Sequence, residues 1–180
     1  MSENIEITLS SQPIYDGKII KLSVDTVQLP NGKQATREIV RHPGAIGILA
    51  VTEENRILLV KQFRKPIDQE LFEIPAGKLE PNEDPKESAI RELKEETGYS
   101  ATNMVQFTKF YTSPGFADEL IYLYRAEGIH AGIANPDEDE FVELLEFTLE
   151  ECLEMIQNGK IIDAKTIVTI YYWQIEHLKD

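Results

Sequence analysis

At 180 residues, with 42% hydrophobic and 28% charged residues, the chain suits one globular domain or one domain with a small added subdomain. The net charge of −14 argues against a general binder of nucleic acid or anionic membranes, because both ligands need a positive surface. No apolar run approaches the ~18–20 residues of a membrane span, and residues 1–12 lack the pattern of a signal peptide. Cys152, the single cysteine, excludes an intrachain disulfide and indicates a reducing, cytoplasmic compartment.

The N-terminal part of the chain is predicted to form a small antiparallel sheet. Residues 14–29 include a stretch that alternates as a strand, and residues 36–41 resume as a second strand. Pro30-Asn31-Gly32 between them favours a turn, because Asn-Gly tolerates positive φ. We therefore expect an antiparallel β subdomain over residues 1–43 and a second domain over residues 44–180, separated at Pro43-Gly44.

The second part predicts an α/β fold with a mixed sheet packed between helices. Residues 45–52 form a continuous apolar run typical of a buried strand, and residues 56–64 are its expected hairpin partner. The remaining elements are expected in this order: a strand at 71–74, a helix at about 85–97, strands at 104–111, 120–126 and 141–147, a helix that begins at Thr148, and a last helix that begins near Asp163.

The predicted helix at its centre carries a strip of carboxylates. Asp84 suits its N-cap and Gly98 its C-terminal stop. Glu92 and Glu96 lie four residues apart on one edge of the apolar face, with Glu95 beside them. Like charges at this spacing destabilise a helix unless a cation is present. Clustered oxygen ligands suit Mg²⁺ or Mn²⁺, and the alternative is a solvated acidic face.

The spacing around this helix resembles the signature of the Nudix hydrolase family. The matching positions are Gly77, Glu83, Arg91, Glu92, Leu93, Glu95, Glu96, Gly98 and Tyr99. Tyr99 departs mildly from the pattern, which has an aliphatic residue there. The resemblance implies a Nudix-type α/β/α sandwich with a small added N-terminal sheet. It also implies metal-dependent hydrolysis of a nucleoside diphosphate linked to another group, in which the metal polarises the diphosphate and activates water.

The resemblance also assigns roles to individual residues. The implied metal ligands are three carboxylates and one backbone carbonyl: Glu92, Glu95, Glu96 and Ala76. Arg91 is expected to orient the glutamates, and Glu83 is expected to tie the preceding loop to the helix.

Motifs outside this signature resemble the bacterial ADP-ribose pyrophosphatases of the family. A proline, Pro114, follows Gly98 by sixteen residues, as in that group. The other matching segments are TREIVRHPGA at 36–45, KQFRKP at 61–66, EIPAGK at 73–78, SPGFADE at 113–119 and DAKT at 163–166. The substrate implied by this resemblance is ADP-ribose, and the implied products are AMP and ribose 5-phosphate.

Candidate substrate contacts follow from the same resemblance. Arg64 is the candidate for the diphosphate, because a guanidinium pairs two phosphate oxygens; a surface charge at a strand end is the alternative. The other candidates are Arg37, Glu38 and Arg41 for adenine and ribose, Lys78, and Ser113, Pro114, Gly115 and Glu119 for the terminal ribose. For the charged residues at 37–41, ordinary exposed strand charges are the alternative.

The catalytic base is expected in the acidic stretch at 135–143. Glu140 is the first choice and Glu138 the second, while a solvated charge run is the alternative for either residue. The expected partner is a second copy of the chain with exchanged N-terminal sheets, and no nucleic acid or membrane. Two other functions stay open: hydrolysis of a nucleotide sugar such as GDP-mannose, and a non-catalytic nucleotide sensor. Such sensors usually lose the glutamates that this chain retains.

Overall fold

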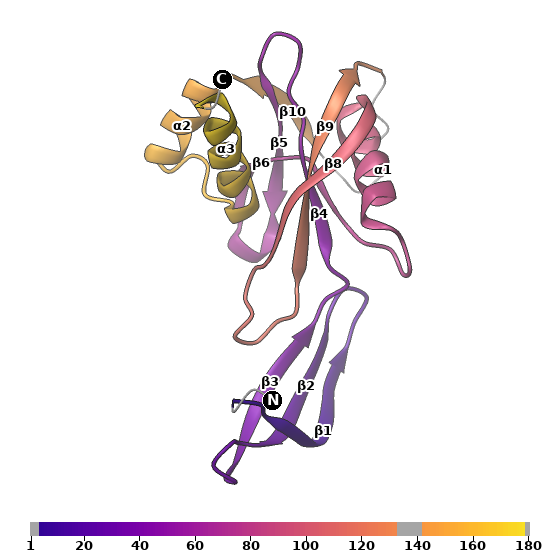
Figure 1. Ribbon diagram of the computed structural model, residues 1–180, viewed down its shortest axis with the longest axis vertical. Helices are drawn as coiled ribbons and strands as arrows, with labels where there is room; N and C mark the ends of the chain where they lie inside the picture. Colours follow the sequence, from indigo (N-terminus) through magenta and orange to yellow (C-terminus); the bar gives the residue numbers. More distant parts are fainter. Residues whose placement is uncertain (1–3, 133–141, 179–180) are drawn as a thin grey trace. The chain divides into compact units, whose positions relative to one another are not determined.

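The computed structural model of the protein describes residues 4–132 and 142–178. It divides into two compact units. The first contains residues 1–44 and 110–120, and the second contains residues 45–109 and 121–180. The N-terminal and C-terminal segments can be followed by colour in Figure 1.

The first unit contains a three-stranded antiparallel sheet in the order β1-β2-β3, formed by β1 (Ile7–Asp16), β2 (Lys21–Gln28) and β3 (Gln34–Arg41). The predicted turn between β2 and β3 is confirmed, with Gly32 at φ 81°. The prediction of two strands was wrong, because β1 adds a third strand and the chain turns at 17–20. All ten residues of β1 are exposed, so its sequence has no alternation of buried and exposed positions that would reveal a strand.

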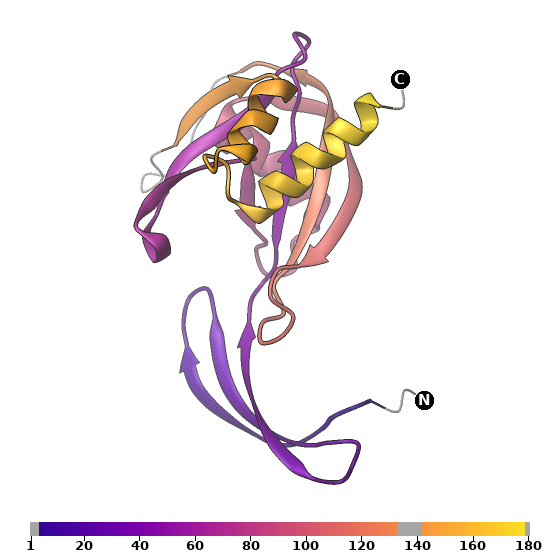
Figure 2. The same ribbon diagram turned by 90° about the vertical axis from the view of Figure 1, so that its left-hand side faces the viewer.

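The second unit contains two further sheets (Figures 1 and 2). A four-stranded sheet has the order β7-β4-β9-β8, with β7 (Ala76–Lys78), β4 (Ala45–Leu49), β9 (Leu120–His130) and β8 (Ser100–Tyr111). Strand β4 pairs antiparallel with β7 and parallel with β9, so the predicted mixed sheet is confirmed. An antiparallel sheet has the order β10-β5-β6, with β10 (Glu143–Phe147), β5 (Ile57–Arg64) and β6 (Gln69–Glu73).

The expected hairpin between residues 45–52 and 56–64 was wrong in its main part. The two segments do pair next to the turn between them: the Thr52 amide donates to the Arg56 carbonyl at 2.8 Å, Val51 bridges Ile57, and the Leu58 amide donates to the Ala50 carbonyl at 2.9 Å. Beyond this point β5 pairs with β6 and β10 instead of β4. Both segments are apolar and buried, and burial alone does not determine which strand lies beside which.

Helices cover both sides of the sheets. Helix α1 (Pro85–Thr97) contacts β4 and β7, whereas α3 (Ala164–His177) contacts β4 and β6 and is joined by α2 (Leu149–Gln157). Figures 1 and 2 show α1 on one side of the strands and the α2–α3 pair on the other. The predicted α/β sandwich is therefore confirmed. The short 3₁₀ helix η1 (Lys65–Ile67) connects β5 to β6.

The predicted helix ends are confirmed by their capping contacts. Asp84 accepts from the Lys86 amide at 2.8 Å at the start of α1, and Gly98 ends that helix at φ 75°. Thr148 and Glu151 form a complete capping box at α2. Asp163 caps α3.

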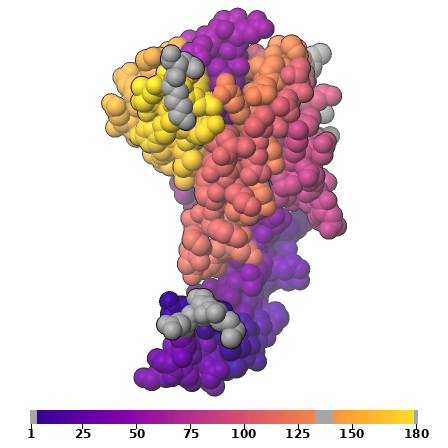
Figure 3. All heavy atoms as spheres, viewed as in Figure 1, coloured from indigo at the N-terminus to yellow at the C-terminus, as the bar shows by residue number. Residues whose placement is uncertain are grey.

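Helix α3 also presents apolar residues to solvent, and its yellow segment reaches the surface in Figure 3. Val168, Tyr171 and Ile175 are 39%, 44% and 51% exposed. Within the described parts of the chain, no helix is long and apolar enough to cross a membrane.

Candidate metal and diphosphate site

The three candidate metal glutamates lie on α1 beside the backbone of β7. A Cβ atom added to Gly77 would lie 1.9 Å from Oε1 of Glu92, so only glycine lets that side chain approach the strand. One residue earlier, the Ala76 amide donates to Oε2 of Glu96 at 3.0 Å. Glu96 is only 5% exposed. The structure thus brings together Ala76, Glu92 and Glu96 from two segments of the predicted signature.

Arg91 links the remaining acidic side chains of this region. Its Nη1 donates to Glu92 at 2.8 Å and to Glu95 at 2.9 Å, and its Nε donates to Glu83 at 3.0 Å. Glu83 also accepts from the Glu80 amide at 3.0 Å, so its carboxylate joins the loop at Glu80 to Arg91 on the helix, as expected. The hydrogen bond from Arg91 is the main cause that lowers the pKa of Glu83 to about 2. Arg91 therefore partly neutralises the strip and sets the orientation of its carboxylates.

The chemistry of these donors fits a hard divalent cation. Glu92, Glu95, Glu96 and the Ala76 carbonyl offer only oxygen, which Mg²⁺ and Mn²⁺ prefer. These carboxylates are engaged with Arg91 and with the Ala76 amide. Among residues 4–132 and 142–178, no three His, Cys, Asp or Glu side chains are gathered closely enough to hold a metal. The residues present therefore fit the ion in donor type, although their carboxylates do not form a ready-made cluster.

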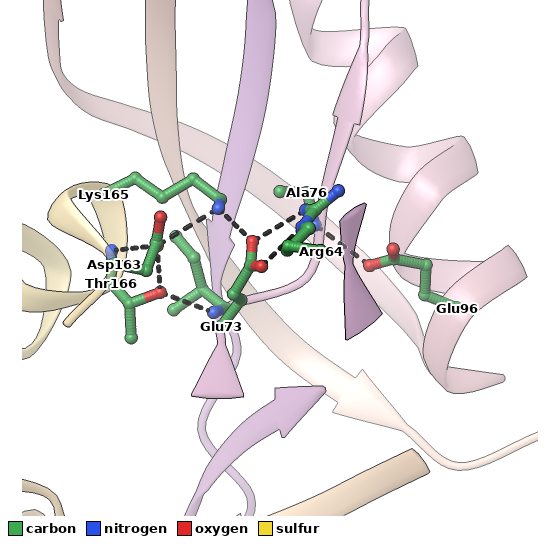
Figure 4. Close-up of polar contacts among 8 residues, drawn as sticks. Arg64, Glu73, Ala76, Glu96, Asp163, Lys165 and Thr166 are labelled. Carbon is green, nitrogen blue, oxygen red and sulfur yellow. Dashed lines mark hydrogen bonds and ion pairs between the residues drawn. The ribbon is translucent and has the colours of Figure 1, made fainter. Parts of the chain in front are cut away.

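Arg64 lies at the end of β5 in a network of charged and polar side chains (Figure 4). Its Nε and Nη2 donate to the two carboxylate oxygens of Glu73 at 2.6 and 2.8 Å. Glu73 is also hydrogen-bonded by Lys165, whose Nζ is 3.1 Å from Asp163. Thr166 completes the network by accepting from the Ile74 amide at 2.9 Å. The site thus joins the ends of β5 and β6 to the start of α3.

The sequence analysis named Arg64 as a candidate diphosphate contact, but it did not predict the residues that bind Arg64 in this network. Glu73, Lys165 and Asp163 fall within matching motifs, but the motifs alone assign them no role. A signal was available for Glu73, since it is a single carboxylate in the apolar run Leu71–Ile74 at the end of a strand. Such a residue is 1% exposed here, and a buried charge requires a partner.

The other candidate substrate residues lie in the first unit, apart from Lys78 on β7. Arg37 donates to Glu6 at 2.9 Å, and Arg41 donates to Asp118 at 2.9 Å. Asp118 also accepts from the His42 amide at 2.8 Å. The Val40 amide donates to the Phe116 carbonyl at 2.8 Å. The contacts of Phe116 and Asp118 hold the segment at 110–120 against the end of β3.

This arrangement brings the two groups of ribose and adenine candidates into one unit. Arg37, Glu38 and Arg41 lie on β3, and Ser113, Pro114, Gly115 and Glu119 lie on the segment bound to it. Glu119 accepts from the Thr112 hydroxyl at 2.6 Å. Asp118 was not predicted to have a role, although it makes the ion pair with Arg41. Glu138 and Glu140, the candidate bases, lie outside the described residues.

This combination of fold, signature helix and carboxylate strip defines a class of protein, and comparison with known families agrees with it. The chain belongs to the Nudix hydrolase family: the NUDIX domain pattern matches residues 41–168. Residues 6–40 match a second pattern, the nucleoside diphosphate sugar hydrolase N-terminal domain. The protein is accordingly a Nudix pyrophosphohydrolase.

Individual relatives are similar over nearly the whole chain. The ADP-ribose pyrophosphatase of Bacillus subtilis (strain 168) is 50% identical over 173 residues, which cover 95% of this chain and 94% of that protein. A methanol dehydrogenase activator of Bacillus methanolicus has the same identity and the same coverage. A crystal structure of an ADP compounds hydrolase superposes with a TM-score of 0.86 over 99% of this chain and 97% of that one. Its sequence identity is 17%, so this likeness concerns the fold alone.

Proposed function

We propose that the protein hydrolyses the diphosphate bond of ADP-ribose to give AMP and ribose 5-phosphate. The observation that carries the proposal is the 50% identity to the Bacillus subtilis ADP-ribose pyrophosphatase over 95% of the chain. This coverage includes the first unit as well as the signature helix. Substrate preference depends on residues outside that helix, so similarity across the whole chain supports the substrate more strongly than the family signature does.

The cofactor we propose is Mg²⁺, or Mn²⁺, held by Glu92, Glu95, Glu96 and the carbonyl of Ala76. Such an ion would neutralise the charge of the diphosphate and activate the attacking water. A cation also removes an electrostatic difficulty, because a chain with a net charge of −14 repels an anionic substrate. The proximity of Ala76 to Glu96, at 3.0 Å between amide and carboxylate, supports a site shared by β7 and α1.

Arg64 is the proposed diphosphate contact that does not depend on the metal. Its side chain is 40% exposed although Glu73 binds two of its nitrogens. A guanidinium presents five N–H donors in a fixed plane. Pairing with one carboxylate therefore leaves donors for phosphate oxygens.

The first unit is proposed to recognise the two ends of the substrate. Arg37, Glu38 and Arg41 would contact adenine and its ribose, while the segment with Ser113, Pro114, Gly115 and Glu119 would contact the terminal ribose; Lys78 is a further candidate. We also propose a homodimer with exchanged N-terminal sheets, in which residues 1–43 serve dimerisation and substrate contacts and residues 44–180 form the catalytic domain. The exposed apolar side chains of β1, including Ile7, Leu9 and Ile14, support an interface there.

The proposed general base is Glu140, with Glu138 as the second choice. Both side chains belong to an acidic stretch, and neither lies among the described residues. Replacing each by Gln separates the two, because only the base should depress kcat by about two to four orders of magnitude.

A substrate panel tests the proposal. ADP-ribose, NADH, GDP-mannose, diadenosine polyphosphates and a nucleoside triphosphate would be supplied at equal concentration with Mg²⁺ and then with EDTA. Products would be resolved by chromatography. We expect AMP and ribose 5-phosphate from ADP-ribose, faster than any other cleavage and abolished by EDTA. Faster cleavage of another compound would overturn the choice of substrate while leaving the reaction class intact.

Two specific observations favour other candidates. The match of residues 6–40 to a nucleoside diphosphate sugar hydrolase N-terminal domain favours a nucleotide sugar, which the GDP-mannose arm of the panel tests. The equal identity to a methanol dehydrogenase activator favours a role in activating such an enzyme. Adding the protein and Mg²⁺ to a purified methanol dehydrogenase tests this role, because an activator would raise the rate of methanol oxidation.

A further inference from the structure

The contacts of Glu73 suggest a role beyond holding two strands together. Glu73 ends β6 and is 1% exposed, yet its carboxylate meets two cations: Arg64 through a two-bond fork and Lys165 through Nζ. Lys165 is the second residue of α3 and is 92 positions away in the sequence. Two elements that are distant in sequence therefore contribute charge to one buried carboxylate.

The signs of these charges alternate along the network. Asp163 is followed by Lys165 and Glu73, and Arg64 stands at the end, with contacts of 3.1 Å at one end and 2.6 Å at the other. Burial raises the pKa of Glu73, but the hydrogen bonds and charges of Arg64 and Lys165 outweigh it and hold the pKa below its usual value. Glu73 is thus an anion in the folded protein, and Arg64 is held against it as a cation.

Arg64 is the accessible end of this network. Its side chain is 40% exposed, compared with 1% for Glu73, 10% for Lys165 and 18% for Asp163. Its Nε and Nη2 bind Glu73, which leaves Nη1 without a bond to that carboxylate. Figure 4 shows the guanidinium between Glu73 and the region of Ala76 and Glu96.

A purely structural role explains these contacts less well. The start of α3 is already fastened to this region by the hydrogen bond from the Ile74 amide to the Thr166 hydroxyl at 2.9 Å. Sequestering charged groups is costly, and buried ion pairs are often no more stabilising than apolar residues of similar volume. A long, flexible arginine side chain, in contrast, gains much from a carboxylate that fixes its plane.

We infer that Glu73 and Lys165 are positioning residues, which fix the Arg64 guanidinium so that it can receive the diphosphate of the substrate. Glu73 sets the plane of the guanidinium through two hydrogen bonds. Lys165 supplies a second positive charge, so the carboxylate does not cancel the attraction of Arg64 for phosphate oxygens. The inference rests on the proposed function only in taking Arg64 as the diphosphate contact.

A double-mutant cycle on ligand binding tests this inference. The dissociation constant of ADP-ribose would be measured by calorimetry in EDTA, so that neither the metal nor turnover contributes. Arg64→Met should weaken binding by about 100-fold and Glu73→Gln by about 10-fold, since the amide keeps one of the two hydrogen bonds. The double variant should bind no more weakly than Arg64→Met. If the double variant instead weakens binding by the product of the two single effects, the residues act independently and the inference is overturned.

Lys165→Met provides a second test in case Glu73→Gln is unstable. We expect it to weaken binding by about threefold to tenfold in the wild-type background, and to have no further effect when Glu73 is already Gln. Unfolding midpoints would be recorded for each variant. A lower midpoint without a change in affinity would contradict the inference, because it would assign Lys165 to stability alone.

A matched control is available in the same unit. Arg125 on β9 and Glu176 on α3 form an ion pair of 2.6 Å with side-chain exposures of 44% and 24%. Arg125→Met should leave the affinity within twofold of wild type. An equal loss in this control would show that any Arg–Glu pair at α3 alters binding, and would overturn the specific role of Glu73.

The outcomes separate this inference from the proposed function. If Arg64→Met binds ADP-ribose as tightly as the wild type, the positioning role is refuted while ADP-ribose hydrolysis stands. If the wild type does not cleave ADP-ribose with Mg²⁺ in the substrate panel, the proposed substrate fails, and the cycle would be run with the diphosphate compound that the panel identifies. If the Glu73 and Arg64 substitutions then weaken binding of that compound independently of each other, the inference is refuted whatever the substrate is.

Discussion

Replacing Gly77 with Ala should displace the side chain of Glu92, a proposed metal ligand, while leaving the fold in place. The added Cβ would lie 1.9 Å from Oε1 and 2.0 Å from Cδ of Glu92. Contacts below about 3 Å cannot persist, so the Glu92 side chain must rotate away from β7. Gly77 is not among the residues with positive φ, so its backbone accepts an alanine.

The cost in stability follows from the interactions that the substitution breaks. A displaced side chain costs about 0.5–1.5 kcal/mol if it leaves its preferred rotamer. The broken bond from Arg91 at 2.8 Å contributes about 1 kcal/mol or less, since that side chain is partly exposed. Alanine also restricts the unfolded chain more than glycine does, which stabilises the folded state by about 0.4–1 kcal/mol. The net change is therefore about 1 kcal/mol, which shifts the unfolding midpoint by only a few degrees.

The loss of activity should be much larger. Because Glu92 is a proposed metal ligand, moving it away should lower kcat/KM at limiting Mg²⁺ by about 10- to 100-fold, the range seen when the surroundings of a metal ligand are disturbed. Hydrolysis would be followed over a Mg²⁺ titration, with Glu92→Ala and the double variant as controls. The double variant should equal Glu92→Ala. The reasoning would be refuted if Gly77→Ala kept wild-type kcat/KM, or if it unfolded the protein.

Three further outcomes follow from the same structure. Arg91→Lys should destabilise the protein by about 1–2 kcal/mol and weaken Mg²⁺ dependence, because one amine cannot span Glu83 and the carboxylates of α1; thermal unfolding and a Mg²⁺ titration measure both effects. The pKa of Glu83 is lowered from 4.5 to about 2, so its contribution to stability is complete above pH 4.5 and lost as the pH falls towards 2. The stability difference between wild type and Glu83→Gln should accordingly shrink over that range in urea titrations, and a constant difference would contradict the assignment. Cys152 is buried, and burial raises the pKa of its thiol to about 12, so native protein at pH 8 should react with iodoacetamide far more slowly than unfolded protein.

Local rules of helix formation explain why α1 could be predicted closely. Its cap at Asp84, its end at Gly98 and the spacing of Glu92 and Glu96 all follow from the geometry of one helix. The close approach of Glu92 to Gly77 could not be predicted from the sequence. The glycine that permits it could be recognised, because the signature places a glycine at a fixed distance before the glutamates. Residues within one signature thus carried most of the information on the proposed metal site.

Pairings between distant segments could not be predicted in the same way. Strand β1 has no buried face, and β5 pairs with β6 and β10 instead of its expected partner β4. The contact between Glu73 and Lys165 spans 92 positions. Nothing in the local sequence specifies which charge meets a buried carboxylate, since that depends on how the start of α3 is placed against the end of β6.

The assignment of the metal site can be tested by comparing ADP-ribose hydrolysis by the wild type and by Glu96→Gln over a range of Mg²⁺ concentrations. The amide oxygen of Gln can still accept the hydrogen bond from the Ala76 amide at 3.0 Å, so the fold and the unfolding midpoint should be retained. We predict AMP and ribose 5-phosphate from the wild type only when Mg²⁺ is present, and turnover reduced by about 100-fold or more in Glu96→Gln. Near-normal turnover by Glu96→Gln would contradict the assignment of the α1 carboxylates as the metal site.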